Sequence, residues 1–143
     1  MNTATNLSAE ELSAIVVDAA FHLHFTLGCG LLESVYQNVL AAVLRKKGLS
    51  VKTETPVVFE YDGIRFDDNL KTDLIVNDEL IVELKSVEQI MPTHCKQLLT
   101  YLRLTGKPLG LLINFGGADF KKNCRRILNG KVDFSNSQLR INQ

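Results

Sequence analysis

The chain has 143 residues, of which 45% are hydrophobic and 22% are charged, as in an ordinary globular domain. Its 16 basic and 16 acidic residues cancel, which argues against a strong nonspecific nucleic-acid binder, because such proteins are usually basic. Three scattered cysteines without a CxxC pair indicate neither a zinc site nor a disulfide framework, and fit a reducing cytoplasm. No apolar run approaches the length of a membrane span, and no secretory signal opens the chain. We therefore expect a cytoplasmic protein with a single domain over residues 1–143 and a core at about 8–128.

Two amphipathic helices are predicted at the start of the chain. Ser8 and Glu11 have the spacing of a capping box, and an apolar stripe predicts a helix over residues 8–27. A glycine-containing break follows. The second helix is then expected from about residue 31 to residue 47, with Gly48 as its stop.

Short runs rich in β-branched residues follow the two helices and predict a series of strands. The runs cover residues 51–54, 57–61, 64–67, 72–76 and 80–85. The Asp62-Gly63 pair between the second and third runs is a strong signal for a tight hairpin turn.

The last third of the chain returns to helical and continuously apolar segments. Pro92 begins a predicted helix that runs to about Thr105. Residues 109–115 are nearly all apolar, which is typical of a strand buried on both faces, and residues 120–128 are predicted to form a short helix. The order of elements indicates an α/β or α+β fold with helices packed on a central mixed sheet.

A carboxylate and a lysine interrupt the otherwise apolar strand Leu-Ile-Val-Glu-Leu-Lys. Alternation along the strand places Glu83 and Lys85 on the same face. Such charges cost free energy unless they are paired, hydrated in a cleft or bound to an ion. Asp73 joins them on that face only if the turn before the strand has three residues, 77–79, because that register pairs Asp73 with Glu83. A two-residue turn would send Asp73 to the opposite face.

This cluster has the donor set of a metal-dependent phosphodiesterase site. Mg²⁺ and Mn²⁺ take hard oxygen ligands, namely carboxylates, backbone carbonyl oxygens, waters and substrate phosphate oxygens. A bound ion neutralises charge on the phosphoryl oxygens and lowers the pKa of a bound water, which can then attack the phosphorus. Lys85, about 7 Å along the strand from Glu83, could position that water or stabilise the developing charge. The alternative is a surface-facing Glu–Lys pair of little energetic consequence.

Further candidates lie on the predicted helices. Glu33 is in the first turn of the second helix, where a carboxylate also favours the helix dipole, so its role as a ligand depends on folding opposite Asp73. Gln97 and Tyr101 share one face of the third helix. Gln97 could hold one side of the site and Tyr101 could contact a phosphate or stack on a base, whereas a solvated glutamine and a half-buried tyrosine are the alternatives. His94 is interpreted as a packing or hydrogen-bonding group.

Basic residues form two clusters. The Arg-Lys-Lys run at residues 45–47 could meet phosphates, but the favoured interpretation is a solvated helix face with a favourable contact to the helix C-terminus. The second cluster lies in the predicted final helix, where it could meet phosphates or form a solvated face; it consists of Lys121, Lys122, Arg125 and Arg126.

Three motifs, taken together, resemble a known family of proteins. The heptapeptide Gly-Leu-Leu-Glu-Ser-Val-Tyr at residues 30–36 resembles the signature of the GxxExxY protein family. Asp73, followed by Glu83-Leu84-Lys85, resembles the core motif of the PD-(D/E)XK nuclease superfamily, with Thr72 where a proline often stands. The pentapeptide at residues 97–101 is similar to the QxxxY element of the RecB-like exonuclease branch. The resemblance covers roughly residues 10–128.

The resemblance implies a restriction-endonuclease-like fold, in which a mixed central β-sheet is flanked by helices. It also implies a set of site residues: Glu33, Asp73, Glu83 and the Leu84 carbonyl as ligands of Mg²⁺ or Mn²⁺, Lys85 as the catalytic lysine, and Gln97 and Tyr101 shaping the site. We therefore expect a metal-dependent nuclease that hydrolyses nucleic-acid phosphodiester bonds, with DNA as the favoured substrate. The alternative is a noncatalytic nucleic-acid- or protein-binding module that keeps the fold. A homodimer is one way to supply a larger DNA-binding surface.

Overall fold

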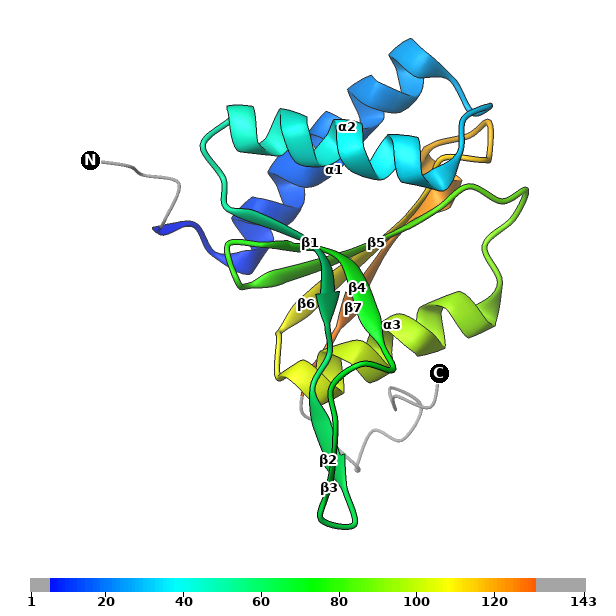
Figure 1. Ribbon diagram of the computed structural model, residues 1–143. Helices are drawn as coiled ribbons and strands as arrows, with labels where there is room; N and C mark the ends of the chain where they lie inside the picture. Colours follow the sequence, from blue (N-terminus) through cyan, green and yellow to red (C-terminus); the bar gives the residue numbers. More distant parts are fainter. Residues whose placement is uncertain (1–5, 131–143) are drawn as a thin grey trace.

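A mixed five-stranded β-sheet lies at the centre of the fold, which the computed structural model describes for residues 6–130. The strand order is β1-β4-β5-β6-β7. Neighbours β5 and β6 are parallel and the other neighbouring pairs are antiparallel, so the sheet is mixed, as predicted (Figure 1). The five strands are β1 (Val51–Pro56), β4 (Lys71–Val76), β5 (Leu80–Lys85), β6 (Leu109–Asn114) and β7 (Cys124–Leu128).

Helices cover both faces of this sheet (Figure 1). Two of them, α1 (Ala9–Leu27) and α2 (Glu33–Lys46), lie on one face, and α3 (Pro92–Thr105) lies on the other. Because α3 connects the parallel strands β5 and β6, the carboxyl ends of these two strands meet at one edge of the sheet. None of the described helices is long and apolar enough to cross a lipid bilayer.

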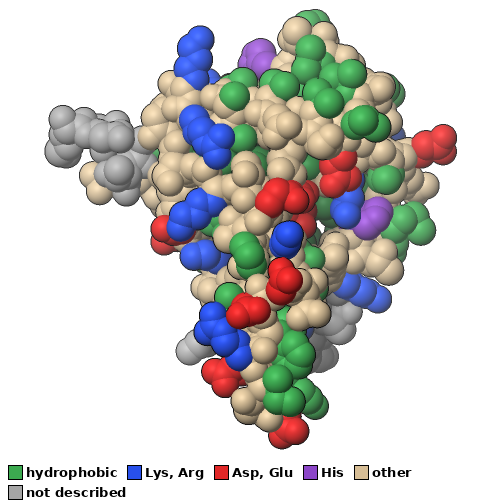
Figure 2. Space-filling view, viewed as in Figure 1, with side chains coloured by type: hydrophobic (Ala, Val, Ile, Leu, Met, Phe, Trp, Pro, Cys, Tyr) green, Lys and Arg blue, Asp and Glu red, His purple; other side chains and the backbone are tan. Residues whose placement is uncertain are grey.

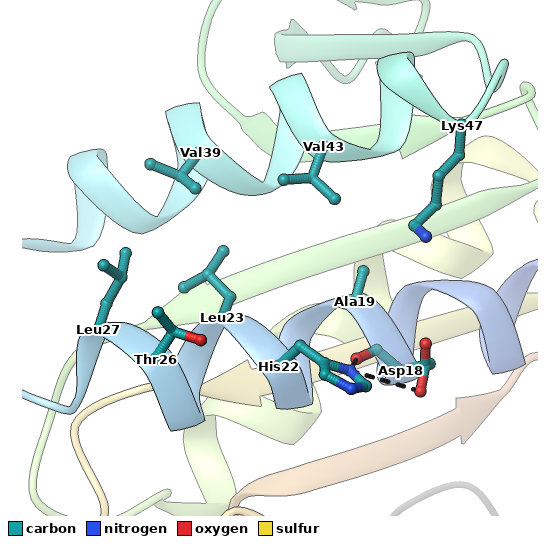
Figure 3. A pocket seen from close by; sticks show the side chains of 9 residues that line it. All are labelled: Asp18, Ala19, His22, Leu23, Thr26, Leu27, Val39, Val43 and Lys47. Atoms are coloured by element: carbon teal, nitrogen blue, oxygen red, sulfur yellow. Dashed lines mark hydrogen bonds and ion pairs between the residues drawn. The ribbon is translucent and has the colours of Figure 1, made fainter.

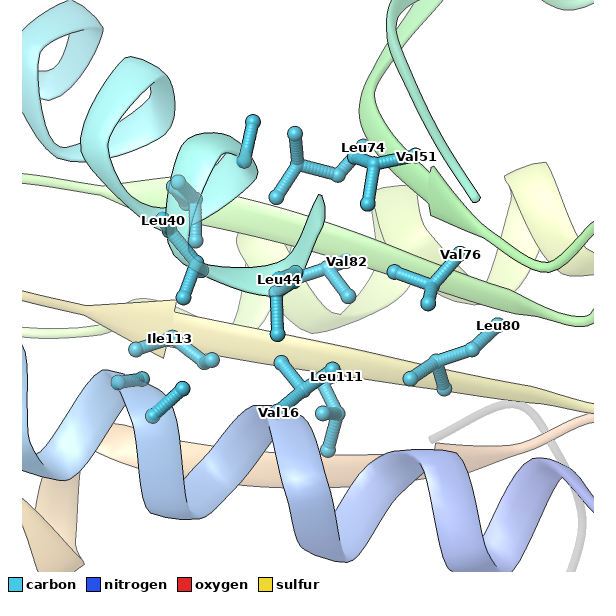
Figure 4. Packing of buried hydrophobic residues seen from close by; sticks show 14 of the residues in the cluster. Val16, Leu40, Leu44, Val51, Leu74, Val76, Leu80, Val82, Leu111 and Ile113 are labelled. Carbon is cyan, nitrogen blue, oxygen red and sulfur yellow. The ribbon is translucent and has the colours of Figure 1, made fainter. Parts of the chain in front are cut away.

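Alternation along β5 divides its side chains between two hydrophobic cores. Leu80, Val82 and Leu84 enter the larger core beneath α1 and α2, whereas Ile81 enters the smaller core beneath α3. This is the division that the sequence pattern predicts. Full burial of each such aliphatic side chain contributes about 1.5–3 kcal/mol to folding. Figure 4 shows side chains of the larger core interlocking between the helices and the sheet, among them Val16, Leu40, Leu44, Leu74, Val82 and Leu111.

Local sequence signals set the helix ends. Ser8 Oγ accepts a hydrogen bond from the Glu11 N–H at 3.1 Å, and Glu11 Oε1 accepts one from the Ser8 N–H at 2.9 Å. This is the predicted capping box, and α1 begins directly after it. The third helix, α3, stops at Gly106, whose φ of 72° a residue with a side chain adopts only at a cost.

A separate two-stranded hairpin extends from the body of the protein (Figure 1). It consists of β2 (Phe59–Tyr61) and β3 (Ile64–Phe66), joined by the predicted turn at Asp62 and Gly63. Both turn residues have positive φ, 54° and 74°, as the tight hairpin turn requires.

The prediction of a helix over residues 120–128 is wrong. Lys121–Asn123 form a 3₁₀ turn, η2, and β7 follows as an edge strand paired with β6. The apolar residues of this segment recur at helical spacing. However, β6 is buried along its whole length and offers an open edge on this side, and pairing with that edge outweighs the local preference.

Candidate active site

The connection between β4 and β5 places Asp73 opposite Glu83. Backbone pairing of Val76 with Leu80 leaves residues 77–79 as a three-residue connection, and the same register continued along the strands brings Asp73 across from Glu83. The sequence-based prediction of this register is therefore confirmed. Both carboxylates lie on the face of the sheet that α3 covers. Ile75 and Ile81, each two residues away along its strand, enter the core beneath α3, and strand alternation puts Asp73 and Glu83 on the same side.

Each of the two carboxylates is held by the backbone of the neighbouring strand. Glu83 Oε2 accepts a hydrogen bond from the Asp73 N–H at 2.7 Å, and Asp73 Oδ2 accepts one from the Leu84 N–H at 2.8 Å. These bonds fix one oxygen of each acid and set the Leu84 backbone directly beside Asp73. The pair is therefore positioned by main-chain atoms of two central strands.

Burial and nearby negative charges raise the pKa of both acids. Burial raises the pKa of Glu83 to about 8, and the nearby charge of Asp73 adds to this shift. Burial likewise raises the pKa of Asp73 to about 6, and the charges of Glu33 and Glu54 push it in the same direction. Lys85 acts the other way on both pKa values. A pair of crowded, desolvated carboxylates favours either a bound proton or a bound cation.

Glu33 reaches this cluster from the first residue of α2. Burial raises its pKa, and the charge of Lys85 lowers it. Glu33 in turn raises the pKa of Asp73, so the fold brings these three groups within electrostatic reach of one another. The end of β5 is tied to the start of α2, because Ser86 Oγ donates a hydrogen bond to the Leu31 carbonyl at 2.8 Å.

Tyr36, three residues after Glu33, holds the loop that precedes α2 in place. Its side chain is fully buried and its ring stacks on Phe115, with 4.4 Å between the ring centroids. Its hydroxyl donates to the Gly28 carbonyl and accepts a hydrogen bond from the Leu31 N–H at 3.2 Å. The tyrosine therefore fixes the loop that leads into α2, and with it the position of Glu33.

Two side chains of α3 approach the carboxylates from the other side. Tyr101 is buried, and burial together with the charges of Glu83 and Asp73 raises its pKa. Gln97 Nε2 donates a hydrogen bond to the Tyr101 hydroxyl oxygen at 3.1 Å. Since that oxygen already accepts a hydrogen bond, the tyrosine O–H is available to donate to an acceptor near the carboxylates.

His94, at the start of α3, has the hydrogen-bonding role that the sequence suggests. Its Nδ1 accepts a hydrogen bond from the Met91 N–H at 3.0 Å. Burial and the charge of Lys85 lower its pKa, so the imidazole is neutral over most of the physiological range.

Glu54 is a further acidic residue that the sequence did not reveal. It lies on β1 opposite Asp73, between the pairs Thr53–Leu74 and Thr55–Thr72, and has a φ of 49°, which is uncommon for a residue other than glycine. Its charge raises the pKa of Asp73 and of Glu33. The only signal for it would have been the pairing of β1 with β4. Figure 2 shows acidic and basic side chains intermixed over the centre of the viewed face.

The chain matches the family model of the PD-(D/E)XK nuclease superfamily over residues 10–127. It belongs to this superfamily. The mixed sheet flanked by helices is the restriction-endonuclease-like fold that the resemblance implied. No curated protein and no solved structure gives a significant match.

PD-(D/E)XK nucleases generally use divalent metal ions, so the donor set of the candidate site can be compared with that need. Within residues 6–130, no three His, Cys, Asp or Glu side chains already form a complete metal-binding group. The opposed carboxylates of Asp73 and Glu83 nevertheless fit Mg²⁺, which proteins commonly hold by one or two carboxylates while waters and substrate phosphates complete its shell. The hard oxygen donors of this candidate site therefore suit a divalent ion such as Mg²⁺ or Mn²⁺.

A hollow in this PD-(D/E)XK protein lies between α1 and α2, away from the carboxylates (Figure 3). Its walls are largely apolar, with Leu23 and Val43 on facing helices. On its rim, His22 Nδ1 bonds to the Asp18 carbonyl at 2.9 Å. It contains none of the residues that the motifs point to.

Proposed function

We propose that this protein is a Mg²⁺- or Mn²⁺-dependent nuclease that hydrolyses phosphodiester bonds, with DNA as the favoured substrate. The observation that carries the proposal is the opposed pair Asp73 and Glu83, held by strand backbone, with Lys85 two residues further along the same face. A Glu–Lys pair with a purely structural role would not require the half-buried carboxylate of Asp73 beside Glu83, because placing two carboxylates together costs folding free energy.

In the proposed mechanism, Asp73 and Glu83 hold the metal ion, with the Leu84 carbonyl and Glu33 as further oxygen donors. The ion, when bound, supplies a water of lowered pKa and neutralises charge on the phosphoryl oxygens. Lys85 donates hydrogen bonds to the attacking water or to the phosphoryl oxygen on which charge develops. Its half-buried position and its effect on the pKa values of the acids support this role.

The two residues of α3 have a positioning role in this proposal. Gln97 orients the Tyr101 hydroxyl, and Tyr101 directs its O–H toward a phosphate oxygen of the substrate. Glu54 adds negative charge beside Asp73 and thereby favours cation binding. Neither residue of α3 needs to bind the metal.

We also propose the finer assignments that the motifs suggest. The buried hydrogen bonds of Tyr36 support membership of the GxxExxY family, because they give the final residue of that signature a defined purpose. The Gln97–Tyr101 hydrogen bond supports the RecB-like branch. A cytoplasmic location, a single domain over residues 1–143 and a homodimer that enlarges the DNA-binding surface complete the proposal.

The second candidate function is a noncatalytic binding module that keeps the nuclease fold. The zero net charge of the chain favours it, since nucleic-acid enzymes of this size usually carry excess positive charge. The absence of a complete three-ligand metal group within residues 6–130 points the same way.

Substitution of Lys85 separates the two functions. The purified protein with Mn²⁺ is expected to cleave single-stranded or duplex DNA, and Lys85→Ala is expected to be slower by at least about a hundredfold, the usual cost of removing one donor to developing charge. Lys52→Ala, which removes an exposed lysine from β1, is the matched control and is expected to cleave normally. Gel analysis of labelled DNA and RNA oligonucleotides provides the readout. If no nucleic acid is cleaved by the wild type beyond the Lys85→Ala level, the nuclease proposal fails.

A further inference from the structure

The basic cluster at residues 121–126 is divided between the two faces of the sheet. Arg126 faces α1, where its guanidinium bonds to both carboxylate oxygens of Glu10, at 2.7 Å to Oε1. Arg125 points to the opposite face, because it pairs with Leu112, a residue of the core beneath α3. The adjacent arginines therefore serve different surfaces, and only Arg125 shares a sheet face with the candidate active site.

Arg125 lies in the same cross-strand row as the candidate metal ligands. Glu83 pairs with Leu112, and Leu112 pairs with Arg125. Two interstrand spacings separate Glu83 from Arg125, a distance of about 10 Å. This corresponds to the rise of about three nucleotides along one strand of a duplex.

Beside Arg125 the surface forms a hollow, which we call the basic hollow. It is lined by residues of the loop after β5 and of the segment that leads from η2 into β7, at the edge of the sheet where β5 and β6 end. Two of its lining side chains are basic and one is acidic; the lining residues are Glu88, Gln89, Ile90, Lys122, Asn123 and Arg125.

A buried hydrogen-bond network fixes the basic hollow relative to the active-site strand. Asn114 is fully buried; its Oδ1 accepts from the Val87 N–H at 2.9 Å, and its Nδ2 donates to the Val87 carbonyl and to Asn123 Oδ1, both at 2.8 Å. Val87 is two residues beyond Lys85, and Asn123 lies between Lys122 and Arg125. The two sides of the hollow are thus joined through one side chain.

Two glycines allow the close approach that this network needs. A Cβ atom at Gly116 would lie 2.3 Å from the Val87 carbonyl oxygen, and one at Gly117 would lie 2.3 Å from Asn123 Nδ2. A side chain at Gly116 would therefore displace the backbone of the loop after β5, and one at Gly117 would displace the Asn123 side chain from this network. These glycines therefore have a packing role. The pair also lacks the spacing and the lysine of a phosphate-binding loop.

We propose that the basic hollow binds a backbone phosphate of the nucleic-acid strand whose scissile bond lies at Asp73, Glu83 and Lys85. The inference rests on the proposed nuclease function. Lys122 and Arg125 supply the cationic donors, and Arg125 can address two phosphate oxygens at once. The strand passes across the loop after β5 and so spans the distance between the two sites. This local site provides phosphate contacts that the net charge of the chain does not indicate.

The test compares two double variants that remove the same charge from the same segment. In EDTA, which prevents metal-dependent cleavage, binding of a fluorescein-labelled single-stranded DNA is measured by anisotropy at several salt concentrations. Lys122→Ala/Arg125→Ala is expected to weaken binding about tenfold and to reduce the salt dependence by about two phosphate contacts. Lys121→Ala/Arg126→Ala is expected to bind within about twofold of the wild type, since these side chains lie outside the hollow. Glu88→Gln is expected to tighten binding, because it removes the one acid in the lining.

Circular dichroism establishes that each variant is folded, and cleavage kinetics add a second readout. Lys122→Ala/Arg125→Ala should raise KM and leave kcat nearly unchanged, because the hollow touches no reacting atom. Equal weakening by both double variants, or no weakening by either, overturns the inference. If the wild type retains Lys85-dependent cleavage in that case, the nuclease proposal stands and only the basic hollow is refuted. If the wild type neither binds nor cleaves nucleic acid, both proposals fall.

Discussion

Asp73→Asn and Glu83→Gln are each expected to lower the kcat/KM for Mn²⁺-dependent cleavage by at least about a hundredfold. Removal of a group that only supports a metal ligand typically lowers metal affinity or activity by about 10–100-fold. Removal of a ligand itself is expected to cost at least as much. Both substitutions keep the size of the side chain and an oxygen that can accept the existing backbone hydrogen bond. The loss should therefore reflect the missing negative charge rather than a disturbed strand pair. The measurement is the cleavage rate of the oligonucleotide that the wild type cuts best.

Glu79→Gln is the matched control for these two substitutions. Glu79 is an exposed acid in the connection between β4 and β5. Its substitution replaces a carboxylate by an amide, as in the two test variants, but outside the candidate site. It is expected to cleave at the wild-type rate. If Asp73→Asn cleaves as fast as Glu79→Gln, Asp73 is not a metal ligand and the assignment is wrong.

Glu83→Gln is also expected to stabilise the metal-free protein at about pH 8, although it removes activity. The raised pKa of Glu83, about 8, means that the folded state holds a proton that the unfolded chain releases above its ordinary pKa of 4.5. The free energy of unfolding of the wild type therefore falls as the pH rises from about 4.5 to about 8. Each pKa unit corresponds to about 1.4 kcal/mol, so the neutral amide should gain about 2 kcal/mol or more at the upper pH. The Tm in EDTA should rise by roughly 5–10 °C.

The pH dependence distinguishes this explanation from a general packing effect. At about pH 5 the Glu83 carboxyl of the wild type is itself protonated, so the two proteins should have nearly equal Tm values. Added Mn²⁺ should raise the Tm of the wild type at pH 8 and leave that of Glu83→Gln unchanged. A Tm difference between the two proteins that is the same at pH 5 and pH 8 is incompatible with titration of Glu83.

Much of the site followed from a single strand pattern and one turn. Glu83 and Lys85 could be placed on one face because a strand alternates. Asp73 was expected opposite Glu83 only if the connection had three residues, and the sequence left a two-residue turn open. The observed register is that of the three-residue connection. The helix start at Glu33 was predictable too, but its proximity to Asp73 depends on the buried hydrogen bonds of Tyr36, which no local pattern encodes.

Features that depend on long-range pairing could not be read from the sequence. Glu54 meets Asp73 only because β1 pairs with β4 across the intervening hairpin, and no sequence signal specifies that register. Residues 124–128 form a strand because β6 presents an open edge, although their apolar spacing favours a helix. That error hid the separation of Arg125 from Arg126, which in a helix would have appeared as one basic patch.

Calorimetric titration with Mn²⁺ at about pH 8 tests most directly whether Asp73 and Glu83 form a cation site, because this pH lies above the Asp73 pKa of about 6 and at the Glu83 pKa of about 8, where a cation readily displaces the remaining proton. The expected result is saturable binding by the wild type and by Glu79→Gln, with no binding by Asp73→Asn. Undiminished binding by Asp73→Asn, or no binding by the wild type at millimolar Mn²⁺, would contradict the assignment of these two acids as the metal-binding pair.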